Sequence, residues 1–531
     1  MYFDRAMETS TAMKQVSRTK SFPAPSRGWI RNDSIAQPKP GGAEVMDNWF
    51  PTAEGARMRK GSSLHATIEA AVTHLAVYDA ATPKFFAASA AAIYDITTPA
   101  DPEVSPTADV SSLTGGDWSS AQFTTSGGTF LTMVNGADDM QQYTGSAWRT
   151  VNAASTPAIT GVATADLSHV WIFKSRQFFV EKDTLSAWYL GVSAVTGAAT
   201  EFPLGAIFPS GGSLLFGATF SLDAGDGLDD FCLFFTDKGE VAVYEGTDPS
   251  SASTFALVGV YKLGVPLHKN AHFKAGGDLA VCTNDGIVPV SSMLRKDRSA
   301  LKGDAVTYNI EEAWRALVDA RAGGAFPFSV ALWHAQTMLV VGIPTYGNFE
   351  AYCIVANART GAWARYTGWD TRTVKVFNDN LYFGTADGTI VRGEVTGADQ
   401  GIPYQAVIVP RFDSLGSPTE KSAISVRMIA RANNSFTPQL FAVSDYEVEI
   451  PTPLAADADE GTNLWDTGVW GESTWGVAAN TKQRRSEWQT AEANGTALAP
   501  GLQVSSGRVT APDVELIRLD LMYEDGEVMS S

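Results

Sequence analysis

Two histidines four residues apart, His268 and His272, are the first residues in this sequence whose types and spacing could bind a metal. On a helix this spacing places both imidazoles on one face, as in the H-E-x-x-H motif of zinc metalloproteases. Here the residue after His268 is Lys269, not the glutamate that the motif uses as its general base. The flanking residues favour strand and loop, so we predict structural histidines and no metal site.

An acidic segment, D-A-G-D-G-L-D-D, is the second candidate for metal chemistry. It contains Asp223, Asp226, Asp229 and Asp230. Carboxylate oxygens suit Ca²⁺, but the EF-hand spacing fails because no glutamate closes the loop. We interpret the segment as a solvated acidic loop.

Motifs for covalent or cofactor chemistry are missing from the sequence. It has no G-x-S-x-G elbow, no P-loop and no G-x-G-x-x-G after a strand. Cys232, Cys282 and Cys353 are too scattered for a disulfide framework or a thiolate zinc site, and they read as small buried side chains. We therefore predict a protein that is not an enzyme, binds no cofactor and is made in a reducing cytoplasm.

The charge balance is strongly acidic, with 39 Lys and Arg against 58 Asp and Glu and a net charge of −19. Proteins that grip phosphates carry basic patches, and this chain as a whole does not. The balance fits solubility, or a passage along which DNA slides without sticking. No run approaches the ~20 apolar residues of a membrane helix, and the first residues lack an apolar signal core. We expect neither a membrane span nor a secretory signal.

Short apolar runs separated by turn residues dominate the middle of the chain, from 66 to 400. Turns at Gly239, Gly286 and Gly388 are separated by 286 − 239 = 47 and 388 − 286 = 102 residues, which is one unit and about two units. Four-stranded propeller blades repeat every ~40–50 residues. The pattern predicts a mainly β protein with an irregular β-propeller-like array of six to eight blades, with stacked sandwiches as the alternative.

One short helical insertion interrupts the array near 304–322. Its apolar residues follow a helical stripe: Ile310, Ala313, Trp314, Leu317 and Val318. Alternating apolar and polar residues after position 401 instead indicate half-buried antiparallel strands. We expect residues 401–531 to form an added β-sandwich-like platform domain.

Residues 1–65 read as an extended N-terminal arm. Five prolines exclude a long helix, but Trp29, Trp49 and Phe50 are too bulky for a disordered tail. We expect this arm to pack on the body of the protein or on a neighbouring subunit. The basic run Arg57, Arg59 and Lys60 could contact phosphate, but we favour a solvated turn or an intersubunit ion pair.

Further candidates for assembly contacts are tryptophans. Trp465, Trp470 and Trp475 recur every five residues in one loop, and Trp314 lies on the helical insertion. Tryptophans at such spacing stack on sugars in lectins, and they also anchor subunit interfaces. We favour the interface for the three loop residues.

The arm contains three segments, G-W-I-R-N-D-S-I-A (28–36), G-G-A-E-V-M-D-N-W-F-P (41–51) and G-A-R-M-R-K-G (55–61). Together they resemble the N-terminus of tail tube and nozzle proteins of short-tailed bacteriophages. The segment V-N-G-A-D-D-M-Q-Q-Y-T-G-S-A-W (134–148) resembles a hairpin of the same proteins. The resemblance is structural, since that family has no catalytic residues to transfer.

The resemblance implies a structural virion protein that forms a ring, with six subunits expected, below the portal and the tail adaptor. Such a ring extends the channel for DNA ejection, carries fibres or tip proteins, and is assembled in the host bacterial cytoplasm. The acidic composition suggests a lumen that repels DNA. A carbohydrate-binding or glycan-cleaving propeller is the competing hypothesis, and a stand-alone bacterial propeller scaffold is the third.

Overall fold

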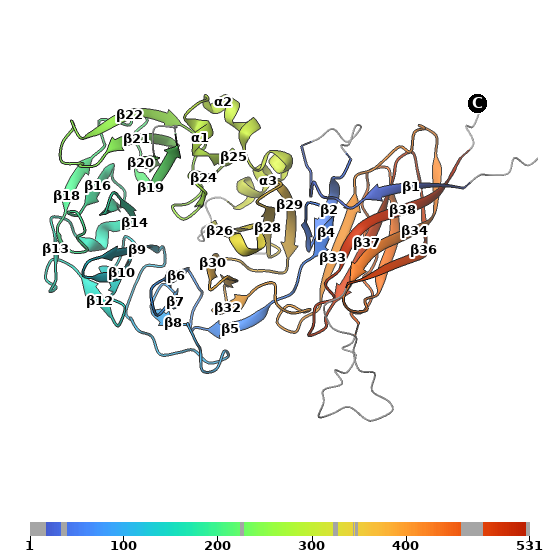
Figure 1. Ribbon diagram of the computed structural model, residues 1–531, viewed down its shortest axis with the longest axis horizontal. Coiled ribbons are helices and arrows are strands. Elements are labelled where there is room, and N and C mark those ends of the chain that lie inside the picture. Colours follow the sequence, from blue (N-terminus) through green and yellow to red (C-terminus); the bar gives the residue numbers. More distant parts are fainter. Residues whose placement is uncertain are drawn as a thin grey trace, which may run out of the picture.

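A computed structural model describes residues 17–32, 40–223, 228–321, 328–343, 345, 349–457 and 482–526. Its fold is mainly β, a ring of small sheets joined to a β-sandwich (Figure 1). No helix of the described part is long and apolar enough to cross a membrane.

Seven sheets form the blades of the propeller in the described residues, and six of them follow one another along the chain. The first blade contains β6 His74–Tyr78, β7 Lys84–Ala88 and β8 Ile93–Asp95, and the second contains β9 Ser119–Thr125, β10 Gly128–Val134, β11 Met140–Tyr143 and β12 Trp148–Val151. The third contains β14 Leu167–Phe173, β15 Arg176–Glu181, β16 Ser186–Tyr189 and β18 Thr200–Pro203, and the fourth contains β19 Leu214–Asp223, β20 Leu228–Thr236, β21 Glu240–Gly246 and β22 Phe255–Lys262. The fifth contains β23 His272–Ala275, β24 Asp278–Thr283 and β25 Gly286–Pro289, and the sixth contains β26 Ser329–Trp333, β27 Met338–Gly342, β28 Tyr352–Asn357 and β29 Ala362–Thr367. A short parallel pair, β13 Ile159–Thr160 and β17 Gly197–Ala198, lies outside these blades.

The seventh blade closes the ring by combining distant parts of the chain. It contains β30 Thr373–Phe377, β31 Asn380–Gly384 and β32 Thr389–Arg392, and its outermost strand is β5, Ser63–Thr67, from the end of the arm. The innermost strands β30 and β6 also contact each other, which completes the circle. The first and last blades are therefore held together by strand pairing.

Tight turns set the register within blades. The β30–β31 turn has Asn378 and Asp379 at φ values of 46° and 57°, and the β14–β15 turn has Lys174 and Ser175 at 42° and 58°. Two consecutive residues with positive φ match the type I′ turn, whose twist suits a two-residue hairpin.

The hydrophobic core lies between blades. One cluster joins the seventh and first blades, another the first and second, and so on around the ring to the fifth. The largest cluster continues through the fifth, sixth and seventh blades into the sandwich. Cys232, Cys282 and Cys353 are buried in these clusters as free thiols, as the sequence predicted.

The platform is a sandwich of two sheets built from both ends of the chain. One sheet contains β1 Arg18–Pro23, β3 Trp49–Pro51, β4 Ala56–Met58, β38 Glu515–Asp525, β34 Lys421–Ala432 and β36 Gln483–Gly495. The other contains β2 Ala43–Asp47, β33 Tyr404–Pro410, β37 Leu498–Ser506 and β35 Pro438–Ser444. Because β2 also pairs with β29, the second sheet continues into the sixth blade.

Three short helices, α1 Val290–Met293, α2 Arg298–Leu301 and α3 Glu311–Arg321, lie between the fifth and sixth blades. The expected stripe is confirmed, since Ile310 just before α3 and Trp314, Leu317 and Val318 on it are buried, and Ala313 packs partly buried against the same cluster. Trp314 also donates its Nε1–H to the carbonyl oxygen of Thr283 at 2.9 Å. The helix is therefore anchored to the fifth blade.

Candidate functional site

Arg59 lies at the junction between the propeller and the platform, and its side chain is 0% exposed. Its two terminal nitrogens donate to both carboxylate oxygens of Asp399 at 3.0 and 2.6 Å, and its Nε donates to Oδ1 of Asn48 at 2.7 Å. The guanidinium also stacks 3.8 Å from the ring centre of Tyr404. The prediction of a solvated turn or an intersubunit ion pair was therefore wrong for Arg59, because its counter-charge is inside the same chain.

The neighbouring basic residues belong to the same junction. Arg57 donates to Glu394 at 2.8 Å, and the backbone N–H of Lys60 donates to the same carboxylate at 3.2 Å. Burial opposes the charge of Arg57, but Glu394 raises the pKa of the guanidinium above its ordinary value. A Cβ at Gly61 would overlap the carbonyl oxygen of Ala398, which explains the glycine that ends this basic run.

The aromatic candidates of the arm are core residues. Trp29, Trp49 and Phe50 are 8%, 0% and 3% exposed, and Trp314 is 2% exposed. They pack in the cluster shared by the propeller and the platform. The three arm residues therefore pack on the body of the protein, which is the first of the two alternatives expected for the arm, and Trp314 is likewise covered by its own chain. Trp465, Trp470 and Trp475 lie outside the described residues.

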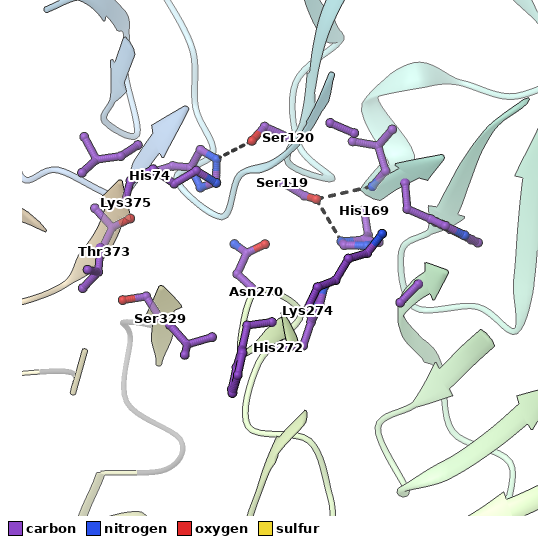
Figure 2. A pocket seen from close by; sticks show the side chains of 18 of the residues that line it. His74, Ser119, Ser120, His169, Asn270, His272, Lys274, Ser329, Thr373 and Lys375 are labelled. Carbon is purple, nitrogen blue, oxygen red and sulfur yellow. Dashed lines mark hydrogen bonds between the residues drawn. The ribbon is translucent and has the colours of Figure 1, made fainter. Parts of the chain in front are cut away.

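A cavity with a volume of about 460 Å³ lies at the centre of the propeller (Figure 2). The innermost strands β6, β9, β14, β19, β23, β26 and β30 all contribute to its wall. Its charged lining residues are Lys274, Arg372 and Lys375, and none of the described lining residues is Asp or Glu. The charged side chains of the cavity wall are therefore all positive, although the whole chain has a net charge of −19.

Three histidines also line the cavity, and the fold keeps them neutral. His169 donates from Nε2 to the carbonyl oxygen of Gly217 at 3.0 Å, so its Nδ1 accepts from the Ser119 hydroxyl at 2.9 Å. His74 is 2.9 Å from the Ser120 hydroxyl, and His272 stacks on Phe216 with ring centres 4.7 Å apart.

Burial is the main cause of their neutrality. It lowers the pKa of His74 to about 3 and that of His272 to about 4, and it lowers the pKa of His169 well below 6.5. The positive charge of Lys375 depresses the pKa of both His74 and His272 further. Burial also lowers the pKa of Lys375 itself.

His268 and His272, which the sequence offers as possible metal ligands, make different contacts. His268 pairs with Asp117 at 3.0 Å, whereas His272 lies in the cavity wall. No group of three or more potential metal ligands occurs among the described residues. Of the acidic segment, Asp230 bonds Ser221 at 2.6 Å and pairs with Lys174 at 2.8 Å, and residues 224–227 lie outside the described part.

Sequence reasoning missed the cavity residues His74, His169 and Lys375. Each looks like an ordinary polar residue in a strand. Their place in the repeat could have identified them, because each lies on the first strand of its blade and the first strand of a propeller blade faces the central axis.

A third candidate surface is the outward face of the platform sheet. Arg431 on β34 and Arg484 on β36 are exposed cross-strand partners. With Arg518, Ile429 and Ile517 they line a shallow hollow of about 260 Å³. Like charges directly opposite each other on a sheet are destabilising. Neither Arg431 nor Arg484 has an ion pair among the described residues, although Glu515 on β38 lies opposite Arg431, whereas nearby Arg427 pairs with buried Asp520 at 2.6 Å.

Comparisons with known proteins give only weak likenesses. The β-propeller domain of Cps50 (Swd1) from Myceliophteria thermophila is 13% identical, covering 63% of this chain and 100% of that chain, with a TM-score of 0.38. YCF48 bound to D1 peptide is 11% identical, covering 62% of this chain and 93% of that chain, with a TM-score of 0.35. The computationally designed Ika8 protein is 11% identical, covering 63% of this chain and 100% of that chain, with a TM-score of 0.34. Scores this low carry no argument, so the propeller is assigned from its own strand pairing.

No protein-family model matches the chain, and no curated protein matches its sequence.

Proposed function

We propose that this chain is a structural subunit of a virus particle, the tail nozzle of a short-tailed bacteriophage. In this proposal copies of the chain form a ring, with six subunits expected, below the portal and the tail adaptor. The ring extends the DNA-ejection channel and carries fibres or tip proteins. Assembly takes place in the host bacterial cytoplasm.

The unpaired arginines of the platform are the observation that carries the assembly part of this proposal. Arg431 and Arg484 oppose each other across two strands without an ion pair in the described residues, and Glu515, opposite Arg431 on β38, pairs with Lys482 at 3.6 Å instead. An arrangement that is unfavourable in the isolated chain becomes favourable when an acidic surface covers it. A neighbouring copy of this chain, with a net charge of −19, offers acidic surface. Arginine and tryptophan are also enriched at interfaces, and Trp488 beside Arg427 is 41% exposed.

The junction around Arg59 supports a mechanical role. The arm passes through both sheets of the platform and then closes the propeller as β5. The buried ion pair with Asp399 lies where these paths meet. A subunit that transmits force along a tail needs its two parts to move together, and one chain segment shared by both parts provides this.

The central cavity gives no support to the competing hypothesis of a glycan-cleaving propeller. Glycosidases use two carboxyl groups on either side of the scissile bond. The described lining of the cavity contains neither Asp nor Glu.

The proposal is tested by light scattering after gel filtration and by negative-stain electron microscopy of the full chain, alone and with the product of a neighbouring adaptor gene. We expect rings, and we expect Arg431→Glu with Arg484→Glu to reduce their fraction strongly. Arg359→Glu makes the charge change of one of these two substitutions at another exposed position and serves as control. A monomer under both conditions would overturn the proposal, and so would rings with an unchanged fraction in the double variant.

A further inference from the structure

We propose that the central cavity of the propeller binds a small organic anion that carries phosphate or carboxylate groups. The anion would lie between Lys375, Arg372 and Lys274, with hydroxyl donors such as Ser329 completing its hydrogen bonds. This inference concerns a ligand site and does not depend on the oligomeric state of the chain.

The charges of the wall are the first argument. Cationic side chains from two blades line one space, Lys274 on β23 and Arg372 and Lys375 at β30. No carboxylate is among the described lining residues, although Arg372 has Asp370 at 3.9 Å outside the lining. Figure 2 shows Lys274 and Lys375 among the labelled side chains around this space. Cations that share a cavity repel each other, and an anion between them removes the repulsion.

Comparison with other buried cations of this chain gives the second argument. Arg59 has Asp399 at 2.6 Å, and Lys269, only 2% exposed, has Asp117 at 2.9 Å and two carbonyl oxygens at 2.7 Å. Lys375 is partly buried and has neither an ion pair nor a hydrogen bond from its ammonium within the described part of the chain. Buried charges in proteins are ordinarily paired, and an anion from outside the chain would supply the counter-charge that Lys375 lacks.

Unused hydrogen-bonding capacity is the third argument. Ser329 is 7% exposed and lies in the cavity wall, yet its hydroxyl has no hydrogen-bond partner among the described residues. A buried hydroxyl left unpaired is costly. An oxyanion accepts from serine hydroxyls and lysine ammonium groups alike, so one ligand satisfies Ser329 and Lys375 together.

The size of the cavity selects the class of ligand. Its volume of about 460 Å³ lies within the range of roughly 300–1,000 Å³ that is usual for sites of small organic molecules. A monatomic anion would leave most of this space to water. The neutral rings of His74 and His272 offer flat surfaces and hydrogen-bonding nitrogens for the organic part.

Isothermal titration of the full chain with pyrophosphate and with citrate, in a buffer free of other oxyanions, tests the proposal and separates phosphate from carboxylate chemistry. We expect saturable binding of at least one probe, with affinity about tenfold or more lower in Lys375→Met. Lys375→Arg keeps the charge and should retain most of the binding. Lys238→Met, at an exposed lysine on an outer turn, should bind as the parent does.

A second measurement covers the case in which Lys375→Met fails to fold. The binding probe should raise the thermal midpoint of the unmodified chain, and Ser329→Ala should reduce that rise. Absence of saturable binding by both probes overturns the proposal. Binding that Lys375→Met and Ser329→Ala leave unchanged overturns it as well, because the anion would then lie elsewhere.

Discussion

Arg59 and Asp399 form a bidentate ion pair that joins the N-terminal arm to the segment leaving the seventh blade. The two residues are 340 positions apart in the sequence, and the arginine is fully buried. Through this pair the arm, the propeller and the platform share one fixed point. The pair therefore gives a direct way to measure how tightly the parts are coupled.

Replacing Asp399 with Asn should lower the free energy of unfolding by about 3–5 kcal/mol, because the Arg59 guanidinium is left buried without the charge of its paired carboxylate. Denaturant titration followed by circular dichroism measures this change. The control is Asp304→Asn, because solvent screens the exposed pair of Asp304 with Lys296 and this variant should lose far less stability. Equal costs at both positions would contradict a structural role for the buried pair.

Ring closure by β5 can be tested at Ala66. This residue is 0% exposed and pairs with Ile390 of the seventh blade. Ala66→Asp places an unpaired carboxylate in the core between the seventh and first blades, and should cost at least about 3 kcal/mol. Thermal melting and limited proteolysis report the loss. Ala81→Asp, in an exposed turn, should change neither.

Substitution of Trp314 tests whether this residue stabilises the core of the chain or an interface between subunits. Trp314→Ala should destabilise the chain by about 3–5 kcal/mol because it empties a buried site and removes the bond to Thr283. Arg315, the next residue of the same helix, is exposed, and Arg315→Ala should lower the free energy of unfolding by about 0.5 kcal/mol. Chemical denaturation measures both values. A Trp314→Ala chain that keeps its stability but changes its oligomeric state would support the interface interpretation instead.

The buried histidines predict a loss of stability in mild acid. The folded pKa values of His74 and His272, about 3 and about 4, lie below the ordinary 6.5, so the unfolded chain binds more protons between these values. Their contribution is complete above pH 6.5 and is lost as pH falls below it, each histidine costing up to about 1.4 kcal/mol per pH unit.

Urea unfolding between about pH 7 and pH 5 measures this slope, in a window above the ordinary pKa range of carboxylates. His74→Gln should reduce the slope, whereas His334→Gln, at an exposed position, should leave it unchanged. Identical slopes in all three proteins would show that His74 does not carry this dependence.

The three thiols should be inert in the folded chain. Burial raises the pKa of Cys282 and Cys353 to about 12 and also raises that of Cys232, so almost no thiolate is present at neutral pH. A colorimetric thiol reagent should react with none of them in native buffer and with all three after denaturation. Rapid reaction of any thiol in native buffer would indicate local opening of its blade.

The sequence by itself determined the parts that depend on neighbours along the chain. Turn residues such as Asn378 and Asp379 specify hairpins through their own backbone preferences, and the stripe around Trp314 specifies a helix through its spacing. The repeat of about 47 residues then indicated blades, because each hairpin pair exposes an apolar face that another must cover.

Only the tertiary structure decided which residues meet across the fold. Arg59 looked like part of a solvated basic turn because nothing near it in the sequence identifies Asp399 as its partner. Lys375 and His74 looked like ordinary strand residues because their shared cavity exists only after the ring closes. Burial and counter-charge depend on contacts between distant segments, and local sequence patterns do not carry that information.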